Sequence, residues 1–559
     1  MNKRFKALPQ ISARAVSFST ALISFLMLLP IAALIYQAIA EYLPFSSLAA
    51  SEIDDTFSDI ADTVLLDYVS NSLFVVTGSL IFASLFAIAP AWWCAHYEFK
   101  GRRYLQWMMV FPLAIPAYIS AYIYTDMLDY AGPIQSSLRH LFDWQTPQDY
   151  WFFDIRSIWG ASLMLGLALY PYIFLLLRNT FEQRSQSLAQ AAQLMGASER
   201  RIFWTIHLPI ARPALAIGCT LVAMESLADY GTVQLFAIST LTTAIYDSWL
   251  VYGSLASAAK ISCLTLLFVL TLVGLEKNSR KEQQHFDSRG SKPCSKVNAS
   301  NTKTGLIWLF CGCVFSLGFA IPLITLISYC FDYWLENMNG DILAHSQSTF
   351  MLATITATIA CLLAILLNSQ QRFQPSKSNQ AKLSLSSLGY AIPGTVLAIG
   401  ILIPLGQLDI WVNHFIQWLG FDKVGLIFSG TSFALIMAFV IRFSAISNGS
   451  IQAAYKQMPD NLDAASTMLK AGRLKTFRKI HLPIMTPAII SAFLLVFIEV
   501  VKELPASLLL RPFDFETLAT YVFQFASDEQ LEHAASGALL IIIVSLLPIL
   551  LLSRSQKMQ

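Results

Sequence analysis

Twelve apolar stretches dominate this sequence, and each is long enough to cross the roughly 30 Å hydrocarbon core of a bilayer. They lie near residues 15–40, 68–93, 105–128, 157–179, 213–235, 258–275, 305–331, 347–368, 384–406, 425–446, 486–504 and 534–553. Only 13% of the residues are charged, against about 25% in soluble domains. Because lipid offers no hydrogen-bond partners, stretches of this length must be helical. The sequence therefore predicts an all-α, polytopic membrane protein with about twelve transmembrane helices.

The connections between these stretches alternate in charge. Residues 41–67 carry seven acidic side chains and no lysine or arginine. Lysine and arginine instead gather in every second connection, namely around Lys100–Arg103, Arg178–Arg212, Lys277–Lys303, Arg372–Lys382 and Arg442–Lys479. Under the positive-inside rule these basic connections and both termini are cytoplasmic. The first apolar stretch is too long for the core of a signal peptide, so we expect it to be retained as a span.

Two of the basic connections repeat one another. RRIFWTIHLPIARPA at Arg200–Ala214 and LKTFRKIHLPIMTPA at Leu474–Ala488 share eight of fifteen positions, at an offset of 274 residues. Both copies lie on the cytoplasmic side, so an even number of spans separates them. The chain is therefore predicted to consist of two parallel homologous halves. IPAY at Ile115 and IPGT at Ile392, and TLTTAIY at Thr240 and TLATYVF at Thr517, are weaker echoes of the same duplication.

This duplication divides the chain into six predicted parts. They are an N-terminal transmembrane helix with an acidic periplasmic loop (1–66), a first transmembrane domain (67–275) with a loop at 187–214, a cytoplasmic linker (276–304), the first helix of the second half with its periplasmic loop (305–346), a second transmembrane domain (347–553) with a loop at 461–488, and a cytoplasmic tail (554–559).

The repeated loop has the features of a docking element. In the first copy, small and apolar residues recur at helical spacing up to Met195, and Gly196 favours a break after them. A second amphipathic piece follows, and Pro209 interrupts it. The alternative is a solvated basic loop that only orients the protein. Orientation requires charge alone, so the repetition of IHLP favours docking.

These two loops resemble the EAA loop of ABC-importer permeases, in which a short coupling helix docks into a cleft on a cytoplasmic ATPase subunit. The resemblance implies the type I ABC importer permease fold. It departs at Gln190, where the family has glutamate, and at Lys470, where it has glycine and this chain has Gly472 two residues later. The docking residues that it implies are Gln190, Ala191, Ala192, Gly196, Phe203, Ile206, His207, Leu208 and Pro209 in the first copy, and Asp463, Ala464, Ala465, Lys470, Phe477, Ile480, His481, Leu482 and Pro483 in the second. We expect both histidines to pack or hydrogen-bond near the docking interface.

A pair of acidic residues follows each loop. Glu225 and Asp229 are four residues apart, and the offset of 274 maps them onto Glu499 and Glu503. Spacing of this kind predicts that the members of each pair share one helix face. A carboxylate facing lipid costs about 2.5–3.5 kcal/mol, so we expect all four to face the bundle interior. One interpretation is that they line a cation pathway, with Lys502 offsetting part of the charge. The alternative is that they are helix-end acids solvated by water on the outside, together with structural hydrogen bonds between the repeats.

Carboxylates suit a hard cation, and the segments around these acids resemble the ferric-iron group of ABC permeases, in which two transmembrane domains are commonly fused in one chain. The resemblance implies three partners besides the lipid bilayer: a periplasmic binding protein that delivers Fe³⁺, and two copies of a cytoplasmic ABC ATPase that carry ATP and Mg²⁺. The sequence contains no phosphate-binding G-x-x-x-x-G-K-[ST] loop. We therefore expect a non-enzymatic permease of the bacterial inner membrane, with no cofactor, no assigned metal site and no nucleic-acid partner.

Two alternatives stay open from the sequence. The cargo of an ABC permease of this kind could be thiamine, which predicts aromatic residues beside the acids. A transporter of another class, driven by an ion gradient, would use Glu225 and Glu499 as proton carriers. The duplicated IHLP loop disfavours that class, because proton coupling does not require a docking element.

Overall fold

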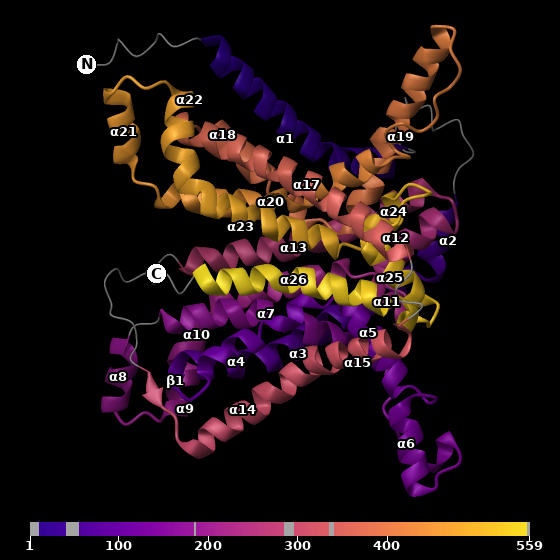
Figure 1. Cartoon of the computed structure of the whole chain (residues 1–559), viewed down its shortest axis with the longest axis vertical. Helices are drawn as coiled ribbons and strands as arrows, with labels where there is room; N and C mark the ends of the chain where they lie inside the picture. The colour runs from indigo at the N-terminus through magenta and orange to yellow at the C-terminus, as the bar shows by residue number, and fades with distance from the viewer. Residues whose placement is uncertain (1–9, 41–54, 184–185, 284–295, 335–339, 556–559) are drawn as a thin grey trace.

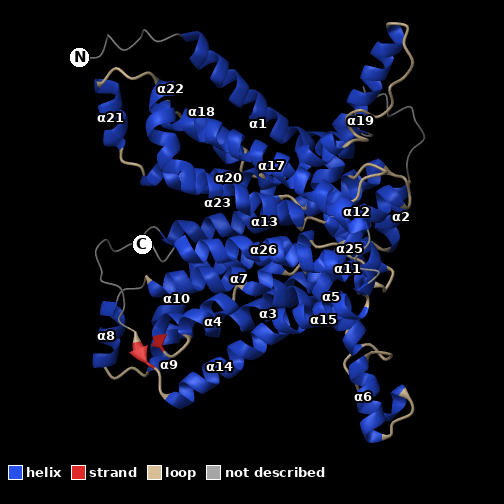
Figure 2. Ribbon diagram, in the orientation of Figure 1, coloured by secondary structure: helices blue, strands red, loops and turns tan. Residues whose placement is uncertain are grey.

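The protein is described by a computed structural model that covers residues 10–40, 55–183, 186–283, 296–334 and 340–555. Helices make up nearly all of it (Figure 2), which confirms the all-α prediction. The first half contains α1 (Gln10–Ile39), α2 (Thr56–Thr63), α3 (Leu65–His96), α4 (Arg102–Met108), η3 (Phe111–Ala114), α5 (Ala117–Leu128), α6 (Pro133–Phe142), η4 (Pro147–Asp149), α7 (Ile158–Glu182), α8 (Gln186–Leu194), α9 (Glu199–Ile202), η5 (Phe203–His207), α10 (Leu208–Ala228), α11 (Gly231–Leu235), α12 (Leu241–Leu250) and α13 (Leu255–Gln283).

The second half contains α14 (Asn301–Phe315), η6 (Ser316–Ala320), α15 (Ile321–Asp332), α17 (Gly340–Phe373), α18 (Lys377–Leu385), η7 (Gly389–Ala391), α19 (Gly394–Trp418), α20 (Ser432–Gln457), α21 (Asp460–Met468), α22 (Arg473–Thr476), η8 (Phe477–His481), α23 (Leu482–Val501), α24 (Pro505–Leu510), α25 (Leu518–Ser527), η9 (Leu531–Ala534) and α26 (Ala535–Ser555). One pair of two-residue parallel strands, β1 (Tyr97–Glu98) and β2 (Val297–Asn298), ties the predicted linker to the end of α3.

Ten helices of the described chain are long and apolar enough to cross a membrane. The third predicted span, 105–128, is not one straight helix, because its two parts, Arg102–Ala114 and Ala117–Phe142, meet at 89°. Pro116 explains the break, since a proline disfavours helical backbone at the residue before it, and Ile115 is extended. Pro393 acts in the same way in the second half, so α19 begins ten residues later than predicted, at Gly394.

The first helix of each half packs on the other half. Helix α1 lies against α17, α18 and α19 as well as α13 of its own half. Helices α14 and α15 lie against α3 and α5, and α15 also packs on α26 of its own half. Hydrogen bonds reinforce the second contact: Trp308 donates to the Lys100 carbonyl at 3.1 Å, and Tyr124 donates to the Leu317 carbonyl at 2.6 Å. The two structural units are therefore interlocked, and each is completed by a helix that the sequence order assigns to its neighbour.

The repeated sequences have the same local structure in the two halves. Thr240 and Thr517 each begin a short helix with a capping box, in which the threonine side chain and the third helical residue hydrogen-bond to each other's backbone. The amide after each threonine donates to a hydroxyl from a long helix, Ser72 in α3 at 2.9 Å and Thr349 in α17 at 2.8 Å. The sequence echo thus reports a conserved contact between helices.

The two repeated loops lie at the same edge of the bundle. Figure 1 shows α8 and α21 at the left, separated by the helices of both halves, while α6 and the end of α19 project at the right. Because both loops are at one edge, the two halves run in parallel, as the sequence predicted.

Candidate functional site

Each repeated loop folds into a short helix, a tight turn and a second helix that enters the membrane-spanning bundle. In the first copy α8 is followed by Gly196 in the left-handed region, with φ of 82°. The Ala197 amide then donates to the Ala192 carbonyl at 3.0 Å. In the second copy the Ala471 amide donates to the Ser466 carbonyl, also at 3.0 Å. Both turns are therefore Schellman motifs with the same hydrogen bond.

Lys470 occupies the turn position that Gly196 occupies in the first copy. Its φ is 54°, in the left-handed region that disfavours residues with a Cβ. Gly472, two residues later, has an ordinary φ of −68° and precedes α22. The second loop thus keeps the backbone of the first without its glycine, and the nearby Gly472 does not substitute for it.

The most exposed part of each loop is a pair of large apolar residues just before the turn. Leu194 and Met195 are 90% and 81% exposed, and their counterparts Met468 and Leu469 are 85% and 83% exposed. We call these four residues the loop tips. None of the four is among the docking residues that the EAA resemblance implies. The sequence pattern indicates only that Met195 belongs to the apolar face of the first loop. The sequence could have indicated them, because each copy of the loop has two adjacent apolar residues at equivalent positions, 274 residues apart.

The predicted docking residues are not all exposed, and Ala192 of the first loop is buried, so it is not on the docking surface. Gln190, Ala191, Ala464 and Ala465 are exposed beside the loop tips. His207 and His481 are instead buried at the base of the loops. His207 packs against the Trp92 ring, 4.7 Å between ring centroids, so the first histidine packs as expected. The remaining IHLP residues continue into α10 and α23, and therefore join each loop to its span.

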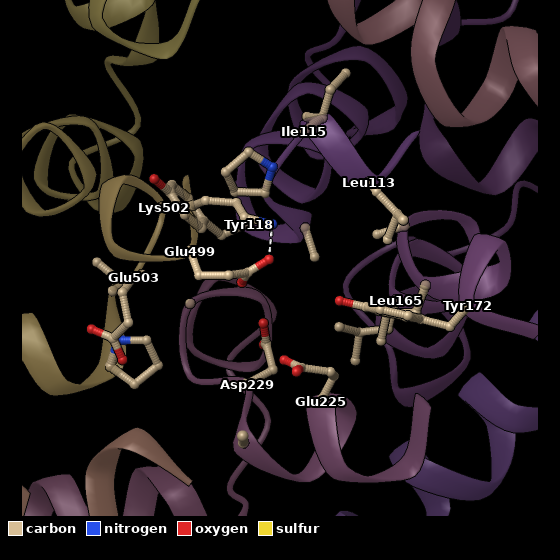
Figure 3. Close-up of a pocket in the computed structure, with 18 of the residues that line it drawn as sticks. Leu113, Ile115, Tyr118, Leu165, Tyr172, Glu225, Asp229, Glu499, Lys502 and Glu503 are labelled. Atoms are coloured by element: carbon tan, nitrogen blue, oxygen red, sulfur yellow. Dashed lines mark ion pairs between the residues drawn. The ribbon is translucent and has the colours of Figure 1, made fainter. Parts of the chain in front are cut away.

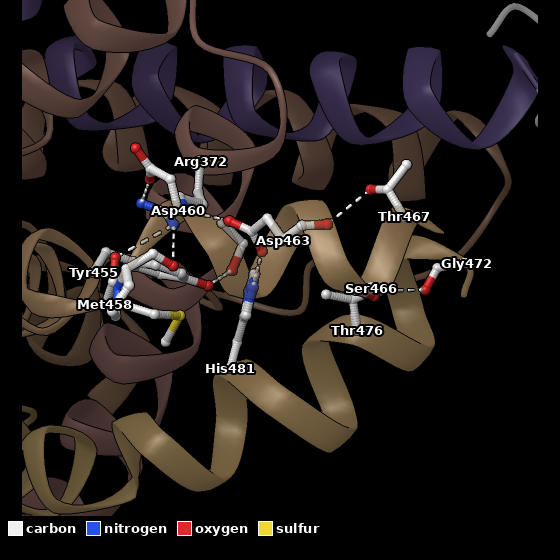
Figure 4. A network of polar contacts seen from close by, with 12 residues as sticks. Arg372, Tyr455, Met458, Asp460, Asp463, Ser466, Thr467, Gly472, Thr476 and His481 are labelled. Carbon is white, nitrogen blue, oxygen red and sulfur yellow. Dashed lines mark hydrogen bonds and ion pairs between the residues drawn. The ribbon is translucent and has the colours of Figure 1, made fainter. Parts of the chain in front are cut away.

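In the second loop, Asp463 holds the short helix to the bundle (Figure 4). Its Oδ1 lies 2.7 Å from His481 Nε2, and its Oδ2 accepts from Arg372 Nε at 2.7 Å. Arg372 also pairs with the exposed Asp460 at 2.7 Å. Asp463 was expected at the docking surface, but its carboxylate is engaged by its own chain. The corresponding residue of the first loop is Ala189, which cannot form such a pair.

The prediction that each acidic pair shares one helix face is wrong, because the helix ends between the two members. Helix α10 ends at Ala228 and α23 ends at Val501. Asp229 accepts from the Thr232 amide at 2.9 Å at the start of α11. Glu503 accepts from the Ala506 and Ser507 amides, both at 3.1 Å, at the start of α24. Each second acid therefore accepts hydrogen bonds from the first amides of a short helix in its own half, whereas the structural alternative expected outside water and hydrogen bonds between the repeats.

All four acids nevertheless line one cavity of about 140 Å³ between the two halves (Figure 3). Glu225 accepts a hydrogen bond from Tyr390 of the other half at 2.9 Å. Glu499 pairs with Lys502 at 3.1 Å, as the sequence suggested. Among the described residues, no three His, Cys, Asp or Glu side chains are grouped to hold a metal ion. The cavity is consequently acidic without being a preformed metal-coordination site.

Arg442 also lines this cavity, contrary to its assignment to a basic cytoplasmic connection. It lies in the middle of α20 and is only 8% exposed. Its Nη1 is 3.5 Å from Glu503 Oε1. The sequence does indicate this site, because Arg442 lies inside the apolar run AFVIRFSAI. An arginine within a membrane span is costly and is usually functional.

Gly394 packs directly on the Arg442–Glu503 pair. A Cβ at this position would overlap Arg442 Nη1 and Glu503 Oε1. In the first half the corresponding residue is Ala117, in IPAY, and the residue corresponding to Arg442 is Ala168, since α7 and α20 begin 274 residues apart. Glycine is therefore found at 394 in the half that has the large Arg442 side chain. In the first half Ala168 is small, which leaves space for the Cβ of Ala117.

Comparison with known proteins agrees with this duplicated architecture. The family described as "binding-protein-dependent transport system inner membrane component" matches this chain twice, at residues 79–281 and at residues 360–559. Together the two matches cover more than half of the chain. The chain belongs to this family. Its two matched regions each contain one of the repeated loops and one acidic pair.

Several relatives of this permease are named for their cargo. It is 24% identical over 505 residues to an Fe(3+)-transport system permease protein FbpB 2 of Haemophilus influenzae, covering 88% of this chain and 90% of the relative. It is 23% identical to a ferric transport system permease protein FbpB of Actinobacillus pleuropneumoniae, covering 85% of this chain and 69% of the relative. A molybdenum transport system permease protein ModB of H. influenzae is 27% identical, covering 37% of this chain and 89% of the relative. Long relatives thus resemble the whole permease, and a short one resembles part of it.

Proposed function

We propose that this permease is the membrane subunit of an ATP-driven importer of ferric iron in the bacterial inner membrane. Two copies of an ABC ATPase engage the loop tips on the cytoplasmic side, where both termini also lie. A periplasmic binding protein delivers Fe³⁺ at the opposite edge, where α6 and the end of α19 project (Figure 1). The charge of the connecting loops supports this orientation.

The loop tips are the observation that carries the ATPase assignment. Each half presents two large apolar side chains that are more than 80% exposed, at the same edge of the bundle. Exposed apolar patches of this kind mark interaction surfaces. Two equivalent patches, one from each half, suit two copies of one partner. ATP binding that brings the two ATPases together would move the loops toward each other and rock the halves around the cavity.

The cavity supports the cargo assignment. It collects two carboxylates from each half at the interface between them, where transporters with parallel repeats bind their substrates. Carboxylate oxygens are ligands for hard cations such as Fe³⁺. The ferric relatives match nearly the full length of this permease.

Reconstitution tests the proposal directly. Proteoliposomes that hold the permease and its ATPase, supplied with binding protein and ⁵⁵Fe³⁺, should accumulate iron only when ATP is present. Glutamate substitutions at Leu194 and Met195, or at Met468 and Leu469, should abolish uptake and co-purification of the ATPase. Leu474→Arg is the matched control, because Leu474 is exposed on the same loop and the first half already has Arg200 there. Uptake driven by a proton gradient without ATP would instead identify an ion-coupled transporter.

Thiamine is a second candidate cargo, because three tyrosines line the cavity beside the acids. Tyr118, Tyr172 and Tyr390 present the aromatic faces that a cationic, aromatic vitamin would require. Unlabelled thiamine should leave ⁵⁵Fe³⁺ uptake unchanged if iron is the cargo. Labelled thiamine uptake without iron uptake would replace the iron assignment and leave the ATPase assignment in place.

A further inference from the structure

Arg442 has donor groups that no described residue accepts. Its Nε and Nη1 are buried, and neither has a hydrogen-bond acceptor among the described residues. A guanidinium has five N–H donors in a planar fork and stays charged. Leaving such donors unfilled in a buried position is costly, so the position requires an explanation beyond packing.

Pairing with Glu503 does not account for this arginine. The two side chains are 3.5 Å apart, which is longer than a hydrogen bond. The Glu503 oxygens are already occupied by the Ala506 and Ser507 amides at 3.1 Å and by the Ser507 hydroxyl at 3.3 Å. In the first half, Asp229 caps α11 in the same way with Ala168 in place of the arginine. The cap is therefore complete without a guanidinium.

The cavity is also an incomplete site for a bare trivalent cation. Two of its carboxylates lie beside basic groups, Glu499 beside Lys502 and Glu503 beside Arg442. No three potential ligands are grouped for a metal among the described residues. A ferric ion that enters this space must bring much of its coordination shell with it.

We propose that the ferric ion crosses this cavity together with a small oxyanion, and that Arg442 holds the oxyanion while Glu225 faces the metal. This inference rests on the proposed transport of iron. The planar fork of arginine matches two oxygens of carbonate or phosphate, and lysine cannot reproduce that geometry.

Double-label uptake tests the proposal. Proteoliposomes with ATPase and binding protein are given ⁵⁵Fe³⁺ with either ³²P-phosphate or ¹⁴C-bicarbonate, and the two arms identify which oxyanion is used. Wild type should import iron and one of the labels in a constant ratio. Arg442→Ala should lower iron uptake about tenfold, the loss expected for a charge-assisted hydrogen bond. Arg442→Lys should fold, keep the charge and raise the oxyanion concentration needed for half-maximal uptake.

Glu503→Gln separates anion binding from a purely structural role. If Arg442 only supported Glu503, Glu503→Gln and Arg442→Ala would have equal effects, neither would depend on the oxyanion, and the inference would fail. Full iron uptake by wild type without either label in the lumen would also overturn it, while leaving iron transport established. Absence of iron uptake by wild type would overturn the cargo assignment, and this inference with it.

Discussion

The two halves place their acids around one cavity but surround them with different charges. Glu225 and Asp229 of the first half form no ion pair among the described residues, whereas Glu499 pairs with Lys502 and Glu503 lies 3.5 Å from Arg442. The backbone around each pair is nevertheless the same, a long helix that ends before a capped short helix. Duplication thus preserved the geometry while substitution made one wall of the cavity acidic and the other mixed.

The two repeated loops differ in a similar way. In the second, the short helix is tied to the bundle by the contact of Asp463 with His481 and Arg372. In the first, the equivalent His207 packs against Trp92. The turns share a Schellman hydrogen bond, although one has glycine and the other lysine at the left-handed position. Two ATPases of one kind would therefore meet two loops with the same shape and different internal support.

The largest expected effect concerns the unpaired acids. Glu225→Gln keeps the acceptor for Tyr390 but removes the free charge, so ⁵⁵Fe³⁺ uptake should fall by at least about tenfold. The double variant Glu499→Gln, Lys502→Gln removes a charge pair and leaves the net charge unchanged, so uptake should fall by no more than about threefold. Equal losses of uptake in the two variants would show that the acids of both halves contribute equally to transport, and would contradict this prediction.

The second prediction addresses the support of the second loop. Asp463→Ala removes the partly buried acid that pairs with the fully buried His481 and leaves Arg372 with only the exposed Asp460, so it should cost about 2–3 kcal/mol in the free energy of unfolding. Asp460→Ala is the control, because Asp460 pairs with the same arginine but is 91% exposed, and its loss should cost below about 1 kcal/mol. Thermal unfolding in detergent measures both. Similar costs for the two variants would mean that Asp463 does not support the loop.

The third prediction couples Gly394 to Arg442. Gly394→Ala pushes a methyl group into the Arg442–Glu503 pair and should destabilise the protein by about 1–3 kcal/mol, the usual range for overpacking. In the background Arg442→Ala, which imitates Ala168 of the first half, the same substitution should have a smaller effect, because the overlap with Arg442 is gone and that with Glu503 remains. A double-mutant cycle on melting temperature measures the difference. Additive effects would show that the glycine is not required by the arginine.

The smallest expected effect is at the loop turns. Lys470→Gly removes the backbone strain of a lysine in the left-handed region and should stabilise the second loop by about 1 kcal/mol. Gly196→Lys should destabilise the first loop by a similar amount, because a Cβ there meets no other atom within 4 Å and only the backbone conformation is affected. Hydrogen exchange of α8 and α21 measures both changes. A destabilised Lys470→Gly variant would show that the lysine side chain makes a favourable contact that outweighs its backbone cost.

Much of the fold was predictable from short-range patterns. Apolar length located most of the spans, although ten helices of the described chain qualify, or eleven with the bent pair, against twelve predicted. The repeated IHLP loop indicated two parallel halves. The errors lie where proline or a cap ends a helix within an apolar run, as at Pro116 and after Ala228. Hydropathy averages over such a run and cannot register where the helix ends, so Asp229 and Glu503 were placed on helix faces that stop before them.

The sequence by itself determined the class of protein, the duplication and the residues around which function is built, because each of these is encoded in composition, periodicity or local identity. Only the tertiary structure decided which of those residues meet. It brings Glu225 to Tyr390 across the halves, turns Asp463 inward to His481 and places Arg442 in the cavity. These pairings depend on how helices distant in sequence pack against one another, since a charge inside the bundle is stable only where the fold supplies its partners.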